Sequence, residues 1–420
     1  MRAKVGNISS QDSSEIYIAF QPLYYMAKVA GLWPQTLKRT SPGFSLPSIT
    51  YQIALYCVIG ICLFVNSDVV LWTKYMSQMN SNILQDGLQI HVISGLIMAI
   101  IMGMVNLLQH QKKWTLMESF GSINSILSKY FFVTIPYKNL KRWFYFLLVV
   151  QNSFLLIVIL SYYYFLAYKL KIETKLLYVS YYIINMTSMA FTIDYVSFVI
   201  STRTRLQLVN RLLKQLLFDE CDEKYSKLTA TPTILKVERP KIEKYSSTSE
   251  INQFIDNVSN LHNKIGEIII LLNRIYSFQL MLNFCAMFLF LVFGLFASYK
   301  AFNAISISFK LLATANGFWI FYYLITMITI IYATSSTVNA NFSIGDTVHR
   351  IIRMHQNTLS SCLVEKLSTF SLQLKMREIT FSCGLFNFDW PLFASILAAV
   401  TMYLVFLIQF DVTPQTQTAL

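Results

Sequence analysis

Aromatic residues gather at one end of three hydrophobic stretches, where they could bind a small molecule. They occur in SYYYFLAY (161–168), YVSYYIIN (178–185) and NGFWIFYY (316–323). Flat aromatic faces with a few polar tips suit small organic compounds such as sugars and alkaloid-like molecules. An aromatic belt at a membrane boundary is the alternative, because Tyr and Trp collect at any such boundary. The candidate ligand-binding residues are Tyr163, Tyr182, Trp319 and Tyr322 for stacking, with His91 and Asn185 for hydrogen bonds.

A single amide, Gln409, interrupts the last hydrophobic stretch, which covers residues 390–411. A polar side chain inside a membrane helix is costly unless it faces a partner or water. Several copies of such a helix, arranged symmetrically, could enclose a pore whose apolar stretch gates by dewetting. The alternative is an ordinary buried helix with one amide at the membrane boundary. The candidate pore-facing residues are Met402, Val405, Phe406, Gln409 and Phe410.

The start and the opposite face of this last stretch carry further signals. Asp389 precedes Trp390 and Pro391 and stands where a helix N-cap belongs. The face away from Gln409 is apolar, and we expect it to pack on neighbouring helices or lipid. Its members are Leu392, Phe393, Ile396, Val400, Leu404 and Leu407.

The sequence contains no motif for catalysis or for binding a metal or cofactor. The five His residues are spread out, and neither an HExxH nor a Walker A, GxSxG or GxGxxG sequence occurs. Cys383-Gly384 is more typical of a turn than of a nucleophile. No hydrophobic stretch holds a pair of carboxylates, as an ion-coupled transporter often does. We therefore expect neither an enzyme nor a cofactor or metal.

The composition predicts an all-α integral membrane protein. Of the 420 residues, 55% are hydrophobic and 13% are charged, about half the charged share of a soluble domain. Seven stretches are long enough to cross a hydrocarbon core of ~30 Å as helices. They cover residues 50–72, 85–108, 143–167, 176–200, 275–298, 316–337 and 390–411.

The basic residues predict the orientation of these spans. Alternate connections, beginning with the N-terminal segment, hold 28 of the 34 Lys and Arg residues, and the other connections hold six. The positive-inside rule then places the N-terminus in the cytoplasm and the C-terminus outside. The net charge of +13 is therefore a topology signal and requires no nucleic-acid partner.

The connections also have structure of their own. The segment 203–218 has helical apolar spacing and continues the fourth span into the cytosol as an amphipathic helix. A mobile loop is expected at 219–248, and an extended helix from residue 251 into the fifth span. The apolar stripe in 345–383 predicts either a helix lying on the membrane or a cytosolic layer that packs against other copies. The segment 19–34 is too short and broken to span, which favours a re-entrant or interfacial piece.

Two of the acidic residues within the expected spans call for a partner or a polar surrounding. Asp68 lies near the outer end of the first span, where contact with headgroups is expected. Asp194 lies in the inner half of the fourth span and requires a partner or water at that depth. We expect a structural pairing, for instance with an arginine of a neighbouring helix, rather than a ligand contact.

The C-terminal residues resemble the insect gustatory receptor family. Thr401-Met402-Tyr403, five apolar residues and Gln409-Phe410 are similar to the family's Thr-Tyr pair, apolar run and Gln-Phe. The segments 370–374 and 381–389 also resemble its last-helix region, and weaker matches extend over the chain. One departure is Met402, which stands where a Thr is usual and places a flexible apolar side chain on the face of Gln409.

This resemblance implies a tastant-gated, non-selective cation channel in the plasma membrane of a gustatory neuron. The implied assembly is a homotetramer, or a heterotetramer with related receptors, in contact with membrane lipid and permeable to monovalent and divalent cations. The last helix lines a central pore, and each subunit binds a sugar or a bitter plant compound in an outward-facing pocket. The expected regions follow the chain in this order: a cytoplasmic N-terminal segment (1–49), spans one to four (50–200), cytoplasmic helical extensions with a mobile loop (201–274), spans five and six (275–337), cytoplasmic anchor helices (338–389), the pore-lining seventh span (390–411) and an extracellular tail (412–420).

Two other classes of multi-pass membrane protein are alternatives to a receptor channel. A G-protein-coupled receptor shares the count of seven helices but requires an outside N-terminus, and its Asp/Glu-Arg-Tyr and Asn-Pro-x-x-Tyr motifs do not occur at the expected helix ends. A polytopic transporter predicts flux without channel current and usually repeated or discontinuous spans, which are not visible.

Overall fold

The computed structural model describes most of the chain. The described residues are 18–33, 46–67, 82–133, 135, 137–164, 175–218, 248–303, 307–354 and 360–417. The expectations for Asp68 and for most of the loop 219–248 lie outside these ranges.

The described chain is helical, apart from an isolated bridge between Ser382 and Asn387. A short helix at 18–29 comes first. The later helices are α2 (Leu46–Ser67), α4 (Asn82–Leu108), α5 (His110–Phe131), α6 (Tyr137–Tyr163), α7 (Lys175–Phe218), α8 (Thr248–Asn303), α9 (Ile307–Met354), α10 (Ser361–Met376) and α11 (Trp390–Gln417).

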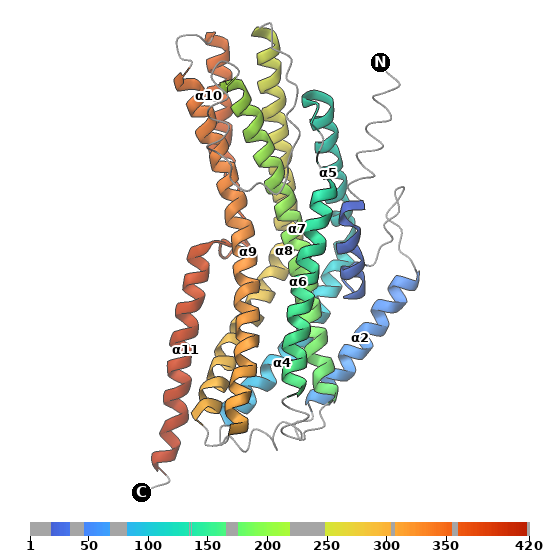
Figure 1. The fold of residues 1–420 in the computed structure, drawn as a ribbon, viewed down its shortest axis with the longest axis vertical. Coiled ribbons are helices and arrows are strands. Elements are labelled where there is room, and N and C mark those ends of the chain that lie inside the picture. The colour runs from blue at the N-terminus through green and yellow to red at the C-terminus, as the bar shows by residue number, and fades with distance from the viewer. Residues whose placement is uncertain are drawn as a thin grey trace.

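Six described helices, α4, α6, α7, α8, α9 and α11, are long and apolar enough to cross a membrane. They correspond to the last six of the seven expected spans. The first expected span falls on α2, whose 22 residues reach ~33 Å as a helix. The described apolar part of α2 is Pro47–Cys62. The prediction of an all-α membrane protein is confirmed, and α2 and α11 stand at opposite edges of the bundle (Figure 1).

Three helices are much longer than a membrane is thick. Helices α7, α8 and α9 have 44, 56 and 48 residues, or ~66, ~84 and ~72 Å, against ~30 Å of hydrocarbon. Beyond their apolar segments they stay together through polar pairs. Asn210 of α7 donates to Ser343 Oγ at 2.8 Å and accepts from Thr347 at 2.6 Å, both on α9. The predicted continuation of the fourth span into 203–218 is confirmed.

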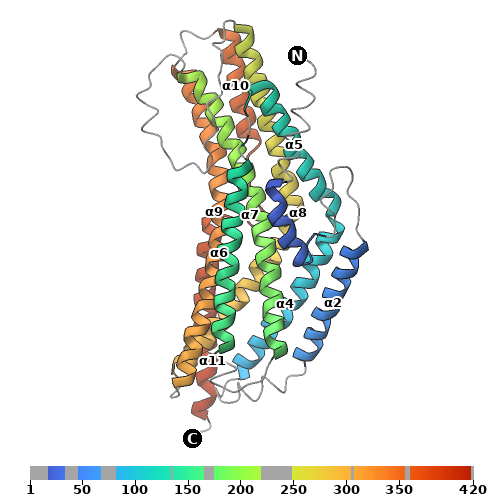
Figure 2. The same cartoon turned by 45° about the vertical axis from the view of Figure 1, so that its right-hand side comes forward.

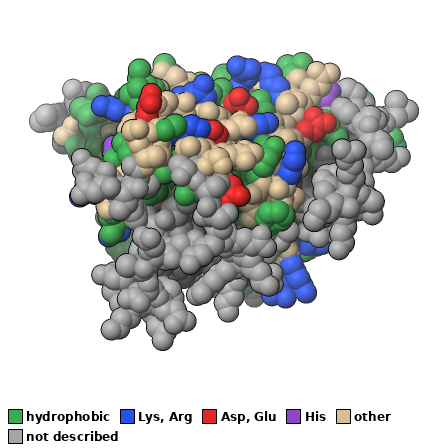
Figure 3. All heavy atoms as spheres, turned by 90° about the horizontal axis from the view of Figure 1, so that it is seen from above, with side chains coloured by type: hydrophobic (Ala, Val, Ile, Leu, Met, Phe, Trp, Pro, Cys, Tyr) green, Lys and Arg blue, Asp and Glu red, His purple; other side chains and the backbone are tan. Residues whose placement is uncertain are grey.

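Helix α10 packs on the extensions of α8 and α9 (Figure 2). Its apolar stripe is buried there through Leu363, Leu367, Phe370 and Leu374. The alternative in which this stripe lies on the membrane was wrong, because α8 and α9 of the same chain cover it. Packing of this layer against other copies stays a prediction. The end of the molecule that carries α10 displays Lys, Arg, Asp and Glu side chains together (Figure 3).

Helix α5 fills a connection for which no helix was predicted. It begins two residues after α4 ends and packs mainly against α8. Its buried face repeats at helical spacing through Leu116, Phe120, Ile123, Leu127 and Phe131.

The helix at 18–29 lies against the bundle. Phe20 stacks on Phe198 of α7 and contacts Phe144 of α6, with ring centroids 4.9 and 5.1 Å apart. After this helix, Gly31 adopts a φ of +72°, which glycine tolerates best, and turns the chain so that Trp33 enters the bundle. The chain therefore forms a packed piece at the place where a re-entrant or interfacial piece was expected.

Helices α4 and α8 approach closely at Gly87, and this contact makes a prediction. A Cβ at Gly87 would collide with the ring of Phe293 on α8, whereas a Cβ at Gly266, also helical, would meet nothing within 4 Å. We expect Gly87→Ala to lower the free energy of unfolding by ~1–3 kcal/mol through overpacking. Gly266→Ala should instead raise it by up to ~1 kcal/mol, because alanine is the better helix former. Denaturant unfolding of the purified protein in detergent measures both, and equal effects would contradict the close contact.

Candidate functional site

A buried aromatic cluster joins α4, α7, α8 and α9. Its centre is Tyr323, whose ring centroid lies 4.4 Å from that of Phe290 and 6.2 Å from that of Trp319. The ring of His91 lies 4.8 Å from Phe290 and edge-on to Tyr323 at 6.5 Å. The Tyr323 hydroxyl donates to Asn185 Oδ1 at 2.7 Å. All five side chains are buried, so the cluster is packed and shielded from water.

Tyr322 extends this cluster towards α6. Its ring stacks on that of Phe154 and meets that of Trp319 edge-on, with the centroids 6.0 Å apart in both pairs. Four of the six residues predicted to bind a ligand, namely His91, Asn185, Trp319 and Tyr322, therefore converge on one cluster.

The other two predicted ligand residues do not join the cluster. Tyr182 lies at the surface with 46% of its side chain exposed. The side chain of Tyr163, at the end of α6, lies outside the described part of the structure. Phe290 and Tyr323 were not singled out from the sequence. Tyr323 was visible only as part of the aromatic stretch 316–323, and nothing local distinguishes Phe290 from the other Phe residues of α8.

Polar side chains continue from the cluster along the contact between α7 and α8. Ser188 Oγ donates to Asn283 Oδ1 at 2.7 Å, and Asn283 Nδ2 donates to Thr192 Oγ1 at 3.5 Å. Gln279 donates to the carbonyl of Met102 on α4 at 3.1 Å. These side chains are buried, so the contact between the two helices is polar inside an apolar bundle.

This polar contact ends at a buried ion pair. Lys113 Nζ of α5 lies 2.9 Å from Asp194 Oδ2 of α7, with side chains 4% and 3% exposed. The Tyr276 hydroxyl donates to the same oxygen at 2.8 Å, and Trp33 Nε1 donates to it at 3.4 Å. The Lys113 ammonium also lies over the rings of Trp33 and Tyr276, at 5.4 and 5.2 Å from their centroids. The structural pairing expected for Asp194 is confirmed, although its partner is a lysine.

A short hairpin at residues 377–389 connects α10 to the last helix. Gly384, with a φ of +86°, forms its turn. The N–H of Cys383 donates to Phe386 O at 3.2 Å, and the N–H of Phe388 donates to Phe381 O at 2.8 Å. The predicted turn at Cys383-Gly384 is confirmed.

Helices α8 and α9 both hold this hairpin. Asn273 and Ser277 of α8 donate to the carbonyls of Thr380 and Ser382, each at 2.7 Å. Thr334 of α9 donates to the carbonyl of Phe388 at 2.6 Å. The two helices that contribute Phe290, Trp319 and Tyr323 to the aromatic cluster thus also fix the segment that leads into α11.

Helix α11 is the most exposed of the membrane-capable helices described. Only 6% of its span is buried inside the chain, against 22–89% for the other five. The face predicted to pack does so against α8 and α9, which confirms that expectation. It comprises Leu392, Phe393, Ile396, Val400, Leu404 and Leu407.

The predicted pore residues lie on the uncovered part of α11. Met402, Val405, Phe406 and Phe410 are 50%, 48%, 46% and 67% exposed, and Gln409 is also exposed. This arrangement leaves their face available for other chains, lipid or water. At the end of the helix, Lys300 of α8 forms an ion pair with Asp411.

Asp389 caps α11, as predicted. Its Oδ1 accepts a hydrogen bond from the N–H of Leu392 at 3.0 Å. We expect Asp389→Ala to lower the free energy of unfolding by ~1 kcal/mol, because one helix N–H loses its partner. Asp389→Ser should cost much less, since a serine oxygen can cap in the same way. Thermal unfolding of the two purified variants compares them, and identical melting temperatures would argue against the cap.

The fold and these contacts define a multi-pass, all-helical membrane protein with a buried aromatic cluster and a peripheral last helix. The chain belongs to the seven-transmembrane chemosensory receptor family, whose family model matches residues 20–414.

Two curated relatives from Drosophila melanogaster carry gustatory receptor names. Gustatory receptor 28b is 29% identical over 169 residues, which is 39% of this chain and 35% of that protein. Gustatory receptor 28a is 28% identical over 235 residues, which is 50% of this chain and 51% of that protein. The matched parts thus cover about a third and about half of the relatives' own lengths.

The fold is also similar to that of a solved receptor. The insect olfactory receptor OR5 from Machilis hrabei superposes with a TM-score of 0.65 at 12% identity, over 95% of this chain and all of that one. The structure of the same receptor in complex with eugenol superposes with a TM-score of 0.65 at 11% identity and the same coverage. At this identity the similarity shows the fold alone.

Proposed function

We propose that this chain is a gustatory receptor subunit that acts as a tastant-gated, non-selective cation channel. The observation that carries the proposal is the exposure of α11, of whose span 6% is buried. A helix this apolar, capped at its start and bearing Gln409 on its open face, suits an assembly in which copies of α11 face one another around water. The family membership and the two gustatory relatives support the sensory role.

The aromatic cluster is the proposed tastant site. Small-molecule pockets are mostly apolar with a few placed polar groups, and His91 and Asn185 supply such groups beside Phe290, Trp319 and Tyr323. Since these side chains are packed together, a tastant has to displace part of the cluster as it binds. The eugenol complex of the olfactory receptor supports a small organic ligand. Sugars and bitter plant compounds both fit this chemistry.

Helices α8 and α9 couple the two sites in this proposal. They meet in the aromatic cluster at Phe290 and Trp319, and they hold the hairpin through Ser277 and Thr334. A tastant that separates the two rings shifts α8 against α9 and so moves the start of α11. Opening follows because the tastant binds the open arrangement more tightly than the closed one.

The remaining parts of the proposal concern assembly and orientation. Four subunits, identical or mixed with related receptors, surround the pore in the plasma membrane of a gustatory neuron. The N-terminus and the end that carries α10 lie in the cytoplasm, as the distribution of Lys and Arg indicates. Monovalent and divalent cations permeate, and lipid covers the outer faces of the bundle.

Whole-cell recording from cells that express this chain alone tests the proposal. A panel of sugars and bitter compounds should evoke a current that reverses near 0 mV in physiological saline and persists when G-protein signalling is blocked. A current that disappears with that block would favour a G-protein-coupled receptor. Tastant uptake without a macroscopic current would favour a transporter.

A further inference from the structure

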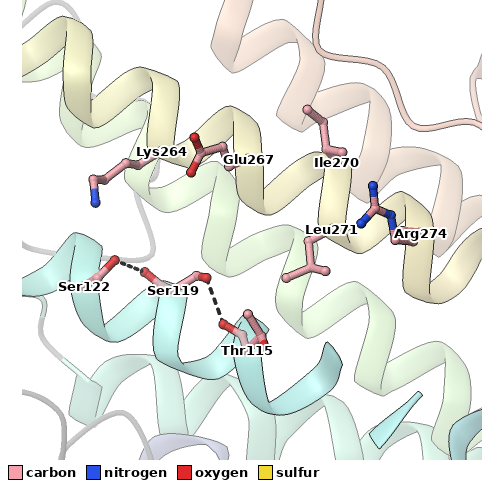
Figure 4. Close-up of a pocket in the computed structure, with 8 residues that line it drawn as sticks. All are labelled: Thr115, Ser119, Ser122, Lys264, Glu267, Ile270, Leu271 and Arg274. Atoms are coloured by element: carbon pink, nitrogen blue, oxygen red, sulfur yellow. Dashed lines mark hydrogen bonds between the residues drawn. The ribbon is translucent and has the colours of Figure 1, made fainter. Parts of the chain in front are cut away.

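A polar groove lies between α5 and α8, away from the aromatic cluster and from α11. It encloses about 270 Å³. Hydroxyl side chains of α5 form one wall, and charged side chains of α8 form the other (Figure 4). The polar lining comprises Thr115, Ser119 and Ser122 on α5 and Lys264, Glu267 and Arg274 on α8.

The hydroxyl wall is arranged to accept hydrogen bonds. Thr115, Ser119 and Ser122 each donate to a backbone carbonyl of their own helix, at 3.1, 2.8 and 3.0 Å. Each hydroxyl proton is therefore engaged, and the oxygen lone pairs remain for donors of a ligand. A row of such oxygens suits a molecule that carries several hydroxyl groups.

The charged wall favours anionic groups at its two ends. Lys264 and Arg274 lie ten residues apart on α8, or ~15 Å along the helix, with Glu267 between them. None of these three takes part in the ion pairs found in the described part of the chain. Lys and Arg bind phosphate through charge-assisted hydrogen bonds, whereas a carboxylate accepts from a hydroxyl. The pattern of cation, carboxylate and cation therefore matches a polyol with phosphate groups at separate positions.

The groove also lies at the expected surface of the membrane. Glu267, Ile270, Arg274 and Phe278 follow one another on one face of α8, at i, i+3, i+7 and i+11. Ile270 and Phe278 are 61% and 49% exposed, and the apolar span is expected to begin at residue 275. Charged and exposed apolar side chains thus alternate along this face, a mixture that suits the boundary between headgroups and acyl chains.

We propose that this groove binds a phosphorylated polyol, the chemistry of an inositol phospholipid headgroup. Lys264 and Arg274 bind phosphate groups, and the hydroxyl wall and Glu267 accept hydrogen bonds from the ring hydroxyls. The same part of α8 holds the hairpin before α11 through Asn273 and Ser277. Occupancy of the groove therefore biases the position of α11, a consequence that rests on the proposed channel function, whereas the binding itself does not.

Binding is measured by fluorescence anisotropy with the purified full chain in detergent and a short-chain, fluorescent phosphatidylinositol bisphosphate. The double variant Lys264→Gln/Arg274→Gln should bind about tenfold more weakly, since it loses two charge-assisted contacts. The matched control Arg350→Gln/Arg353→Gln removes two exposed charges near the end of α9 and should change the affinity less than about twofold. A melting curve for each variant verifies that it is folded.

Two competition arms identify the ligand. Short-chain phosphatidylglycerol should compete poorly with the probe, and Ser119→Ala/Ser122→Ala should reduce this preference for the inositol ring. If soluble inositol phosphates displace the probe at the same concentration as the lipid, the binding groove is supported and its ligand is a soluble inositol phosphate. Equal weakening by both charge-removing pairs, or equal competition by phosphatidylglycerol, would overturn the proposal. The test does not use channel current, so it can fail or succeed independently of the proposed function.

Discussion

Lys113→Met is expected to lower the free energy of unfolding by ~3–5 kcal/mol, because it leaves a buried carboxylate without its cation. The Asp194 side chain is 3% exposed and, among the described residues, would retain the neutral donors Tyr276 and Trp33. Four parts of the chain meet at this carboxylate: the segment after the helix 18–29, α5, α7 and α8. Denaturant unfolding in mixed micelles, followed by tryptophan fluorescence, measures the loss.

Two further variants separate the buried ion pair from general effects of charge. Lys366→Met breaks the pair with Asp256, whose side chains are 33% and 61% exposed, and should cost less than ~1 kcal/mol. Adding Asp194→Asn to Lys113→Met removes both buried charges and should recover much of the lost stability. If Lys113→Met lowered the free energy of unfolding no more than Lys366→Met, the buried pair would not stabilise the fold more than an exposed one.

Charge substitutions at Gln409 are expected to change the conductance of the proposed channel in opposite directions. In a tetramer, Gln409→Glu places a ring of carboxylates at the pore mouth, and Gln409→Lys places a ring of ammonium groups there. In water, the electrostatic interaction energy between a single charge and a cation 4 Å away is ~1 kcal/mol. This energy corresponds to about a fivefold change in the local cation concentration. Single-channel recording should therefore show a larger cation conductance for Gln409→Glu and a severalfold smaller one for Gln409→Lys.

The same two variants contain their own control. The tastant concentration for half-maximal response should stay nearly constant, because Gln409 lies on α11 and the proposed ligand site lies among α4, α7, α8 and α9. A shift in that concentration with unchanged conductance would contradict the assignment of Gln409 to the pore.

Local signals in the sequence identified the features that depend on neighbouring residues. Hydrophobic length located the spans, and Asp389 before Trp390-Pro391 identified the cap of α11. Cys383-Gly384 identified the turn. In each case the residues that form the feature lie within one short stretch, so a local pattern is enough to reveal it.

Contacts between residues far apart in the sequence could not be predicted from local patterns. The burial depth of Asp194 required a partner, but Lys113 lies 81 positions away on a helix that was not predicted. The spacing of Leu116, Phe120, Ile123, Leu127 and Phe131 would have revealed that helix, because it repeats on one face. The stripe of α10 was visible, but periodicity shows that a face is buried and does not identify what covers it.

The aromatic site shows the same division. The aromatic stretches predicted a ligand cavity open to the outside, and in the structure Trp319 and Tyr322 belong to a packed, buried cluster. Tyr182 does not, because a stretch of consecutive aromatics on a helix points in several directions and only some of its members can face the bundle. Phe290 could be found only from the packing of α8 against α9.

State-dependent modification of Gln409→Cys tests most directly whether a tastant opens a pore lined by α11. A membrane-impermeant, positively charged thiol reagent is applied from outside to cells expressing the variant, with and without tastant. Leu404→Cys, on the packed face of α11, and the unmodified chain with its native cysteines receive the same reagent. We predict a rapid, irreversible loss of current for Gln409→Cys only while the tastant is present, and little change for the two controls. Modification that leaves the tastant-evoked current of Gln409→Cys unchanged, or that affects Leu404→Cys equally, would contradict the account.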